Sequence, residues 1–355
     1  MKPNNFKVLF LAVIFLLTYS CSKEDEKNED TGFAHGVFIV NEGAYDSNNG
    51  SITHYNKKTS TVSPNIFTSA NGRSLGDVVQ SFAVIGDIGL IVVNHSQKIE
   101  VVDMESFESL GTILGIDYPR YGLGVSDSKA YISDGSFEGY VWVIDLSDLS
   151  ISNQIVVGKG PENLIKCGNY VFVANSGGWD KDSTLSIIDT QSDQVSKTVN
   201  VGIGPTDLVM DVNGDIWVLC KGFFSFDQYW NLTVEDSPRL VRVDGTSFNI
   251  TADHEILTAG GFFSPNRLAI SADGKALYFL EIGGIYKMNI TDSNPPLKPF
   301  ITGNYYGIDV DPANGDIYAL PGVFNANGEA SVFDKDGILV NSFEAGIGTN
   351  AAVFK

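Results

Sequence analysis

The sequence predicts an all-β fold, a seven-bladed β-propeller in which the C-terminal strand pairs into the N-terminal blade. Three observations lead to this prediction. A short apolar strand, a tight turn and a second strand recur from Gly36 onward, at intervals typical of four-stranded blades. Glycine makes up 37 of the 355 residues, which favours many short strands joined by tight turns. The last residues resemble the one inner strand that the N-terminal repeat lacks.

The second strand of each repeat can be followed by the residue at its end. Successive ends are separated by 53, 40, 41, 45, 61 and 40 residues. A spacing of about 40–50 residues is that of a four-stranded blade, so seven ends predict seven blades. The two longer intervals predict loop insertions, because loops vary more than strands. The predicted ends are Asn41, Asn94, Asp134, Asn175, Cys220, Glu281 and Pro321.

An inner first strand precedes six of these ends, but none precedes Asn41. Residues 350–354 follow a Gly-Ile-Gly-Thr segment, where other repeats carry Gly-x-Gly-Pro before the first strand. We therefore expect residues 350–354 to pair with residues 37–40 and close the ring, which removes exposed sheet edges. The six other inner strands are expected at residues 81–85, 121–125, 163–165, 207–210, 267–270 and 307–310.

The two cysteines within the predicted propeller are expected to be free thiols. Cys167 ends a first strand, and Cys220 ends a second strand of the next repeat. First and second strands run in opposite directions, so the two ends lie on opposite faces, whereas a disulfide requires Cα atoms about 4.4–6.8 Å apart. Both side chains are expected to act as small core hydrophobes.

The N-terminus has the features of an export signal. Lys2 and Lys7 accompany an apolar run at residues 8–17, which is shorter than the roughly 20 residues of a membrane-spanning helix. Ser20 then precedes Cys21. This arrangement resembles a bacterial lipoprotein signal peptide, so we expect residues 1–20 to be removed and Cys21 to be lipidated. The alternative is an ordinary secretory signal with an incidental cysteine.

Residues 21–35 are expected to form a flexible acidic tether, and residues 36–355 the propeller. The Lys-Glu-Asp-Glu sequence that begins at Lys23 resembles the surface-export signal of Bacteroidota lipoproteins. A solvated charged linker explains the same residues. The expected location is the outer membrane, with the protein anchored by lipid and exposed at the cell surface.

The acidic composition of the chain excludes two classes of binding partner. The chain has 23 Lys and Arg against 43 Asp and Glu, for a formal net charge of -20. Nucleic-acid binding needs clustered basic residues, so we expect no nucleic-acid partner. A basic patch for anionic lipid is equally disfavoured, which leaves the lipid anchor as the expected membrane contact.

One face of the predicted propeller collects the loops between second and third strands and the loops that enter the first strands. These loops are long and aromatic, whereas the opposite turns have the Gly, Asn and Asp chemistry of plain hairpins. Loops on a rigid scaffold often carry binding residues, although core packing is the favoured interpretation of any single aromatic residue. The candidate ligand-binding residues are Asn41, Glu42, Tyr45, Tyr118, Arg120, Tyr121, Phe137, Asn163, Trp179, Phe224, Tyr229, Trp230, Arg267, Tyr305, Tyr306 and Phe324.

The sequence favours a binding protein over an enzyme, with no cofactor and no metal. It contains no H-E-x-x-H, G-x-S-x-G or P-loop motif, and its four histidines lack metal-ligand spacing. Glu162 and Asp207 occupy matching positions in adjacent repeats, as a central divalent-metal site would require, but structural hydrogen bonding is the favoured interpretation. Residues 46–50 and 180–182 carry part of a calcium-loop ligand set, and turn chemistry explains them better.

Residues 170–205 contain the segments YVFVANSG and STLSIIDTQSDQVSKTVNVGIGP. They resemble the YVTN-type propeller repeat of YncE-like proteins. Together with the N-terminal signal and the segment VNEGAYDSNNGSITHYN at residues 40–56, the chain resembles surface propeller lipoproteins of Bacteroidota, including the BtuG-type cobalamin-binding family.

This resemblance implies a surface protein that binds cobalamin or a related corrinoid and delivers it to a TonB-dependent outer-membrane transporter. Two alternatives stay open. One is an adhesion or scaffold propeller that binds a glycan or a protein, and the other is a lactonase-like metal-dependent hydrolase.

Overall fold

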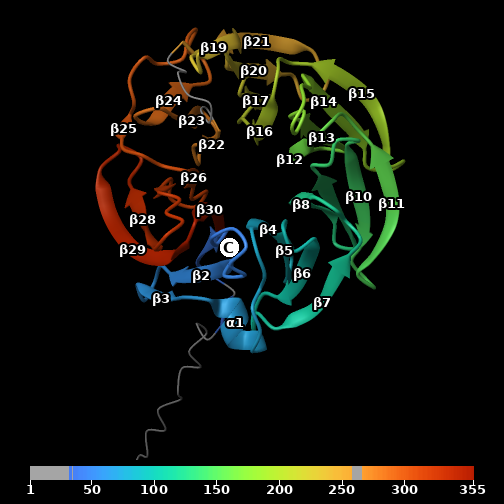
Figure 1. Cartoon of the computed structure of the whole chain (residues 1–355), viewed down its shortest axis with the longest axis vertical. Coiled ribbons are helices and arrows are strands. Elements are labelled where there is room, and N and C mark those ends of the chain that lie inside the picture. The colour runs from blue at the N-terminus through green and yellow to red at the C-terminus, as the bar shows by residue number, and fades with distance from the viewer. Residues whose placement is uncertain (1–31, 34, 258–265) are drawn as a thin grey trace, which may run out of the picture. The chain divides into compact units, whose positions relative to one another are not determined.

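The structure is a computed structural model that describes residues 32–355, except residue 34 and residues 258–265. The described residues form seven four-stranded sheets, arranged as blades around a central axis, and one additional two-stranded hairpin (Figure 1). All strand pairs within the blades are antiparallel. The predicted seven-bladed β-propeller is confirmed.

The first four blades follow the chain in order, except that the first also contains the last strand. The first blade consists of β1 (Val37–Asn41), β2 (Ser51–Asn56), β3 (Thr61–Ser63) and β30 (Thr349–Phe354). The second consists of β4 (Val79–Ile85), β5 (Ile88–Val93), β6 (Lys98–Asp103) and β7 (Ser109–Leu114). The third consists of β8 (Pro119–Ser126), β9 (Lys129–Asp134), β10 (Tyr140–Asp145) and β11 (Ser150–Val156). The fourth consists of β12 (Pro161–Cys167), β13 (Tyr170–Asn175), β14 (Thr184–Asp189) and β15 (Gln194–Asn200).

The fifth blade is interrupted by the additional hairpin. It consists of β16 (Pro205–Met210), β17 (Ile216–Cys220), β20 (Arg239–Val243) and β21 (Ile250–Glu255), and the hairpin consists of β18 (Phe223–Phe226) and β19 (Leu232–Asp236). The sixth consists of β22 (Leu268–Ile270), β23 (Ala276–Glu281), β24 (Gly284–Asn289) and β25 (Ile301–Thr302). The seventh consists of β26 (Gly307–Val310), β27 (Ile317–Leu320), β28 (Asn327–Phe333) and β29 (Leu339–Ile347).

The predicted strand positions agree closely with the structure. Five second strands end at the predicted residue, and the other two end one residue earlier, at Val93 and Leu320. The next residue after Leu320 is Pro321, which has no N–H with which to extend the ladder. The inner strands β4, β8, β12 and β16 begin two residues earlier than predicted.

The C-terminal strand closes the ring as predicted. In β30, Phe354 pairs with Val37 and Ala351 pairs with Val40, so the inner strand of the first blade comes from the far end of the chain. Figure 1 shows β30 between β26 and the blue strands of the first blade. The inner edge of β1 is therefore paired.

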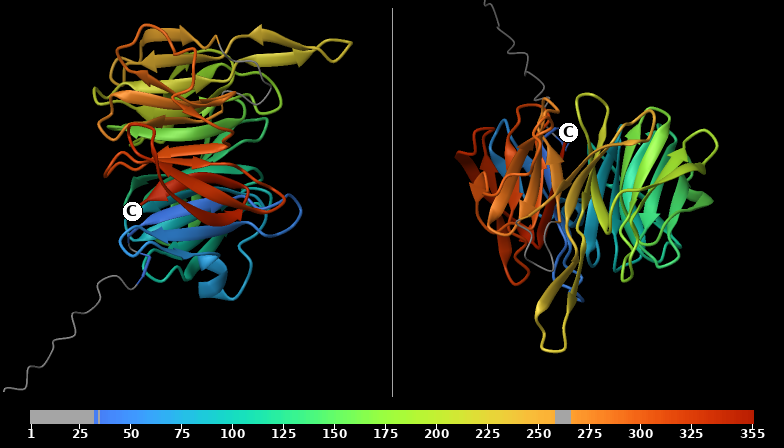
Figure 2. Two further views of the ribbon diagram at one scale, coloured as in Figure 1. Left: turned by 90° about the vertical axis from the view of Figure 1, so that its left-hand side faces the viewer. Right: turned by 90° about the horizontal axis from the view of Figure 1, so that it is seen from above.

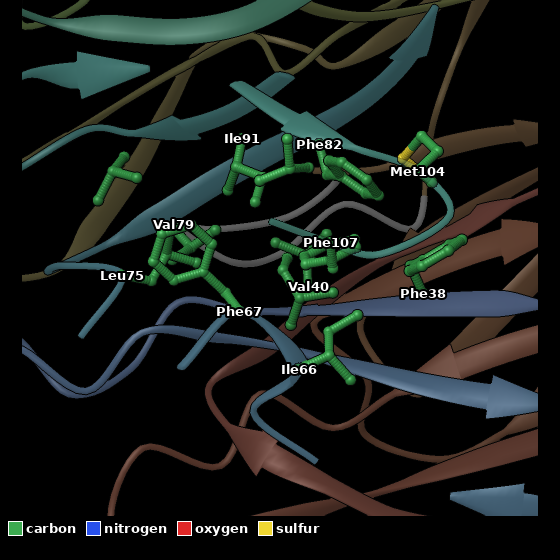
Figure 3. Packing of buried hydrophobic residues seen from close by; sticks show 13 residues of the cluster. Phe38, Val40, Ile66, Phe67, Leu75, Val79, Phe82, Ile91, Met104 and Phe107 are labelled. Carbon is green, nitrogen blue, oxygen red and sulfur yellow. The ribbon is translucent and has the colours of Figure 1, made fainter. Parts of the chain in front are cut away.

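Apolar packing between neighbouring blades forms the core. Second strands such as β17 and β23 are buried along their whole length, because each blade is covered on both faces by its neighbours. Between the first and second blades, Phe38, Phe82 and Phe107 pack together (Figure 3). The short helix α1 (Ile66–Asn71) adds buried Ile66 and Phe67 to this cluster.

The prediction for the two propeller cysteines is confirmed, because Cys167 and Cys220 are both free thiols. Cys220 is buried in the core between the fourth and fifth blades, and Cys167 packs against the same core. Burial raises the pKa of the Cys220 thiol well above its ordinary value.

The predicted signal peptide, the lipidation of Cys21 and most of the tether fall on residues 1–31, outside the described residues. They stay predictions. Among the residues that the structure describes, no helix has the length and apolar character needed to cross a membrane.

Candidate functional site

The loop face of the propeller carries the exposed aromatic side chains. This face contains the loops between second and third strands and the loops that enter the first strands. Among the exposed large hydrophobic side chains of the described residues, every aromatic one lies in these loops or on the hairpin. Trp179 and Trp230 are 98% and 82% exposed. We call the following set the aromatic face: Tyr45, Tyr118, Phe137, Trp179, Phe226, Tyr229, Trp230 and Phe324.

The hairpin extends the aromatic face away from the ring (Figure 2). At its tip, the Asp227 carboxylate accepts backbone hydrogen bonds from Tyr229 and Asn231, which fixes a tight turn. Near its base, Lys181 pairs with Glu235 at 2.9 Å. Tyr229 and Trp230 are therefore held in solvent by a defined turn.

Three of the predicted site residues are buried: Glu42, which takes part in the axial hydrogen bonds described below, and Asn41 and Phe224, which do not. Asn41 is fully buried, and its amide donates to Ser51 Oγ and Thr53 Oγ1 at 3.1 Å each. Its Oδ1 accepts the backbone N–H of Gly346 at 3.0 Å, which joins the first and seventh blades. Phe224 is also buried. Both side chains support the fold and offer no contact surface.

Other predicted residues gather around the central axis because of a repeated irregularity in the inner strands. Pairing between first and second strands shifts register near the N-terminal end of β4, β8, β12, β16 and β30. A bulge of this kind redirects the side chains of the extra residues. The bulged segments contain Gln80, Arg120, Tyr121, Glu162, Asn163, Thr206 and Asn350.

Arg120 links three blades at the loop-face end of the axis. Its Nη1 donates to Gln80 Oε1 of the second blade at 2.6 Å. Its Nε and Nη2 lie 2.9 and 2.8 Å from Glu162 Oε2 of the fourth blade. This partly buried ion pair ties neighbouring inner strands together.

Arg267 bridges the axis itself. Its Nη1 donates to the hydroxyl of Tyr121 at 2.9 Å, which connects the sixth blade to the third. Two blades lie between these residues one way round the ring and three the other way, so the bond crosses the central channel. Desolvation opposes the charge of Arg267, but Tyr121 and Asp207 raise the pKa of its guanidinium above the ordinary value.

Further hydrogen bonds join polar groups near the axis. We call the following residues the axial network: Glu42, Gln80, Arg120, Tyr121, Glu162, Asn163, Asp207, Arg267, Tyr306 and Asn350. Asp207 accepts hydrogen bonds from Asn163 Nδ2 and from the backbone N–H of Leu268. Burial raises the pKa of Asp207, although Arg267 and these donors oppose the increase. In the first blade, Glu42 accepts hydrogen bonds from Tyr306 Oη at 3.2 Å and Asn350 Nδ2 at 2.8 Å.

Several predicted aromatic residues contact other side chains of the propeller. Tyr306 lies with its ring edge against Phe324, at a centroid distance of 5.5 Å, and Tyr305 packs against Phe333. The Lys159 ammonium lies over the Phe137 ring, with Nζ 4.5 Å from the ring centroid. The structure thus divides the predicted residues into the exposed aromatic face, the axial network, the buried pair Asn41 and Phe224, and the half-buried Tyr305.

A cavity of about 680 Å³ lies on the far side of the axial network from the loop face. It follows the inner strands β16, β22, β26 and β30 toward the short turns, with Tyr121 and Arg267 at its network end. Asp309 lines it and accepts the backbone N–H of Ala352 at 2.7 Å. Burial raises the pKa of Asp309 to about 7. Five residues that take part in the axial hydrogen bonds, Tyr121, Asn163, Asp207, Arg267 and Asn350, therefore line part of this cavity.

The stability advantage of the Asp309→Asn variant over the wild type should grow as the pH rises. The pKa of Asp309 is raised from 3.8 to about 7 on folding, so the wild-type protein loses stability between about pH 4 and pH 7, as the folded state is forced to hold the ionised carboxylate. Asparagine stays neutral, and its advantage over the wild type should grow by about 2 kcal/mol between pH 5 and pH 8. Urea unfolding at both pH values measures this change. Asp336→Asn, at an exposed position, is the control, and an equal response of both variants would refute the assignment.

The central carboxylates do not fit a divalent-metal site. Glu162 is paired with Arg120, and Asp207 is surrounded by amide donors and lies near Arg267. Metal-binding carboxylates converge with further oxygen or nitrogen ligands, whereas these two face cations and N–H donors. The hydrogen-bonding interpretation of these residues agrees with the structure.

The closed ring of seven blades defines a β-propeller protein. Residues 35–335 match the family model described as "Domain of unknown function (DUF5074)". The chain therefore belongs to the DUF5074 family. A search of curated proteins gave no significant match.

Several solved structures are similar to the chain. One is a quinoprotein alcohol dehydrogenase-like protein from Bacteroides thetaiotaomicron, with a TM-score of 0.67 and 16% identity, covering 92% of this chain and 79% of that one. Another is hydrazine synthase of Kuenenia stuttgartiensis, with a TM-score of 0.59 and 15% identity, covering 75% and 86%. The computationally designed Ika8 protein gives 0.57 and 11%, covering 91% and 92%. Identities this low show the shared fold alone.

Proposed function

We propose that the protein binds a large ligand on the aromatic face, and that the ligand is cobalamin or a related corrinoid. The observation that supports this most directly is the confinement of the exposed aromatic side chains to one face. Exposed aromatic groups cost solvation free energy, and their grouping on one face is typical of an interaction surface. A corrinoid has a broad ring edged by amides, so it suits aromatic surface with hydrogen-bonding groups nearby.

The axial network supports this proposal by making the platform rigid. Its hydrogen bonds join inner strands from opposite sides of the ring, such as those of Arg267 and Tyr121. Loops that are anchored to a rigid scaffold lose little entropy when a ligand binds. The cavity is a less suitable site for a ligand on the loop face, because its lining follows the inner strands toward the short turns on the opposite face.

The proposed setting is the outer surface of the cell. The N-terminal sequence supports lipidation at Cys21, and the acidic tether supports export to the surface. We propose that a TonB-dependent outer-membrane transporter receives the ligand from the loop face. Protease shaving of intact cells tests the location, and full protection of the protein would place it in the periplasm instead.

An adhesion or scaffold role is the second candidate. The hairpin that carries Tyr229 and Trp230 projects beyond the ring, which suits contact with a glycan or a protein surface (Figure 2). Under this alternative, the aromatic side chains form the contact and no corrinoid binds. A binding measurement with cobalamin separates the two candidates.

Replacing the most exposed tryptophans should weaken corrinoid binding without changing the fold. Trp179→Ala and Trp230→Ala each remove a large side chain with little packing against the ring. Aromatic hot spots are often worth about 2 kcal/mol or more, which corresponds to about thirtyfold in affinity. Equilibrium dialysis with cyanocobalamin measures the effect. Leu297→Ala, an exposed aliphatic position on the opposite face, is the control and should bind like the wild type.

A further inference from the structure

Three potential metal ligands from separate loops meet on the loop face between the first and second blades. Asp46 lies between β1 and β2, Asp77 precedes β4, and His95 lies between β5 and β6. One ligand atom from each lies within 4.8 Å of the other two. His95 Nε2 is 2.9 Å from Asp46 Oδ1 and 3.9 Å from Asp77 Oδ2. Tetrahedral zinc with bonds of about 2.0–2.1 Å separates its ligand atoms by about 3.3–3.5 Å, so small side-chain rotations would give the required spacing.

The state of Asp77 is an independent indication that a ligand belongs here. Asp77 is only 6% exposed, and its Oδ1 is buried without a hydrogen-bond partner. An ionised carboxylate that is buried in this way costs several kcal/mol unless a cation compensates it. Within the described part of the chain, its ion-pair partner is His95, at 3.9 Å. A cation bound at this carboxylate would compensate its charge at a shorter distance than the imidazole does.

The surrounding backbone holds the three residues in place. The N–H of Gly50 donates to the carbonyl of Gly76 at 3.0 Å, which joins the loop of Asp46 to the segment of Asp77. The N–H of Asp77 donates to Ser96 Oγ at 2.9 Å, which joins that segment to the loop of His95. The Tyr45 ring packs on the His95 ring at a centroid distance of 4.5 Å. The site is therefore built on fixed elements rather than on free side chains.

We propose that Asp46, Asp77 and His95 bind a divalent transition-metal ion of the zinc class. Imidazole is a ligand for zinc and similar ions, whereas calcium and magnesium prefer oxygen ligands alone. Three protein ligands leave at least one coordination position open, as in zinc sites that also bind a water or a substrate. Because Asp46 is exposed, the open position faces solvent beside Tyr45 of the aromatic face. This metal site stands independently of the proposed corrinoid binding.

Calorimetric titration of untagged, EDTA-stripped protein with Zn²⁺ tests the proposal. We expect saturable binding of one ion per chain, and weak or no binding of Mg²⁺ and Ca²⁺. His95→Gln and Asp77→Asn should each lower the Zn²⁺ affinity at least about tenfold, since even outer-shell changes around a metal cost 10–100-fold. His254→Gln replaces a histidine of the fifth blade, outside this cluster, and should bind Zn²⁺ like the wild type.

Circular dichroism of the metal-free variants at the titration temperature confirms that they are folded. The proposal is overturned if the wild type shows no saturable Zn²⁺ binding, which would leave His95 as a simple partner of the two carboxylates. It is also overturned if the folded His95→Gln and Asp77→Asn variants both keep the wild-type affinity.

Discussion

A chain that ends at Thr349 will lose most of its thermal stability and will aggregate. Removing residues 350–355 leaves the inner edge of β1 without its partner and uncovers the apolar residues around it. Asn350 and Ala352 are buried in the intact protein, and Phe354 packs on Tyr318 at 5.2 Å. Loss of a single core side chain costs about 2–5 kcal/mol, and whole proteins are stable by only about 5–15 kcal/mol. The exposed edge of β1 is also a template for intermolecular pairing.

Thermal denaturation and size-exclusion chromatography measure this effect. The matched control removes only Lys355, which gives up the final backbone hydrogen bonds with Gly36 and leaves every residue of β30 in place. We expect the control to elute like the full chain, with a melting temperature close to that of the full chain. A truncated protein with unchanged melting temperature and solubility would contradict the closure of the ring by β30.

Arg120→Met will destabilise the folded protein by about 2–4 kcal/mol. The change removes the cation that bridges Gln80 and Glu162, and leaves the partly buried Glu162 carboxylate uncompensated. Adding Glu162→Gln to the same chain should recover part of the loss, because the neutral amide no longer needs a cation. Urea unfolding of the single and double variants gives the coupling between the two residues.

The control for this prediction is Arg239→Met. Arg239 pairs with Asp253 at 2.6 Å, but this pair lies on the outer strands of the fifth blade and is more exposed. Exposed pairs contribute about 0–1 kcal/mol. If Arg120→Met costs no more than Arg239→Met, the Arg120 ion pair at the axis does not stabilise the ring.

The fold could be predicted from the sequence because its signal is local and repeated. Second strands that are buried on both faces give continuous apolar runs, such as residues 170–174 and 216–219, and their spacing counts the blades. Ring closure could be predicted because residues 350–354 supply the strand type that the first repeat lacks. The aromatic face followed from the same topology, since the loops after second strands all reach one face.

The axial network and the metal-ligand cluster could not be predicted, because their residues are distant in the sequence. Arg267 and Tyr121 are 146 residues apart, and His95 lies 49 residues from Asp46. No short motif marks such pairs, and the histidines therefore lacked recognisable metal-ligand spacing. The polar loop around Asn41 predicts a surface residue, but its amide oxygen accepts the N–H of Gly346 in the neighbouring blade, 305 residues away in sequence.

Calorimetric titration of the purified protein with cyanocobalamin tests the central claim most directly. At micromolar protein, corrinoid binding on the aromatic face predicts a saturable heat with one ligand per chain. The acidic net charge of the protein does not oppose a nearly neutral ligand. Absence of any saturable heat at this concentration would contradict the corrinoid proposal and leave adhesion to a glycan or a protein as the better account of the aromatic face.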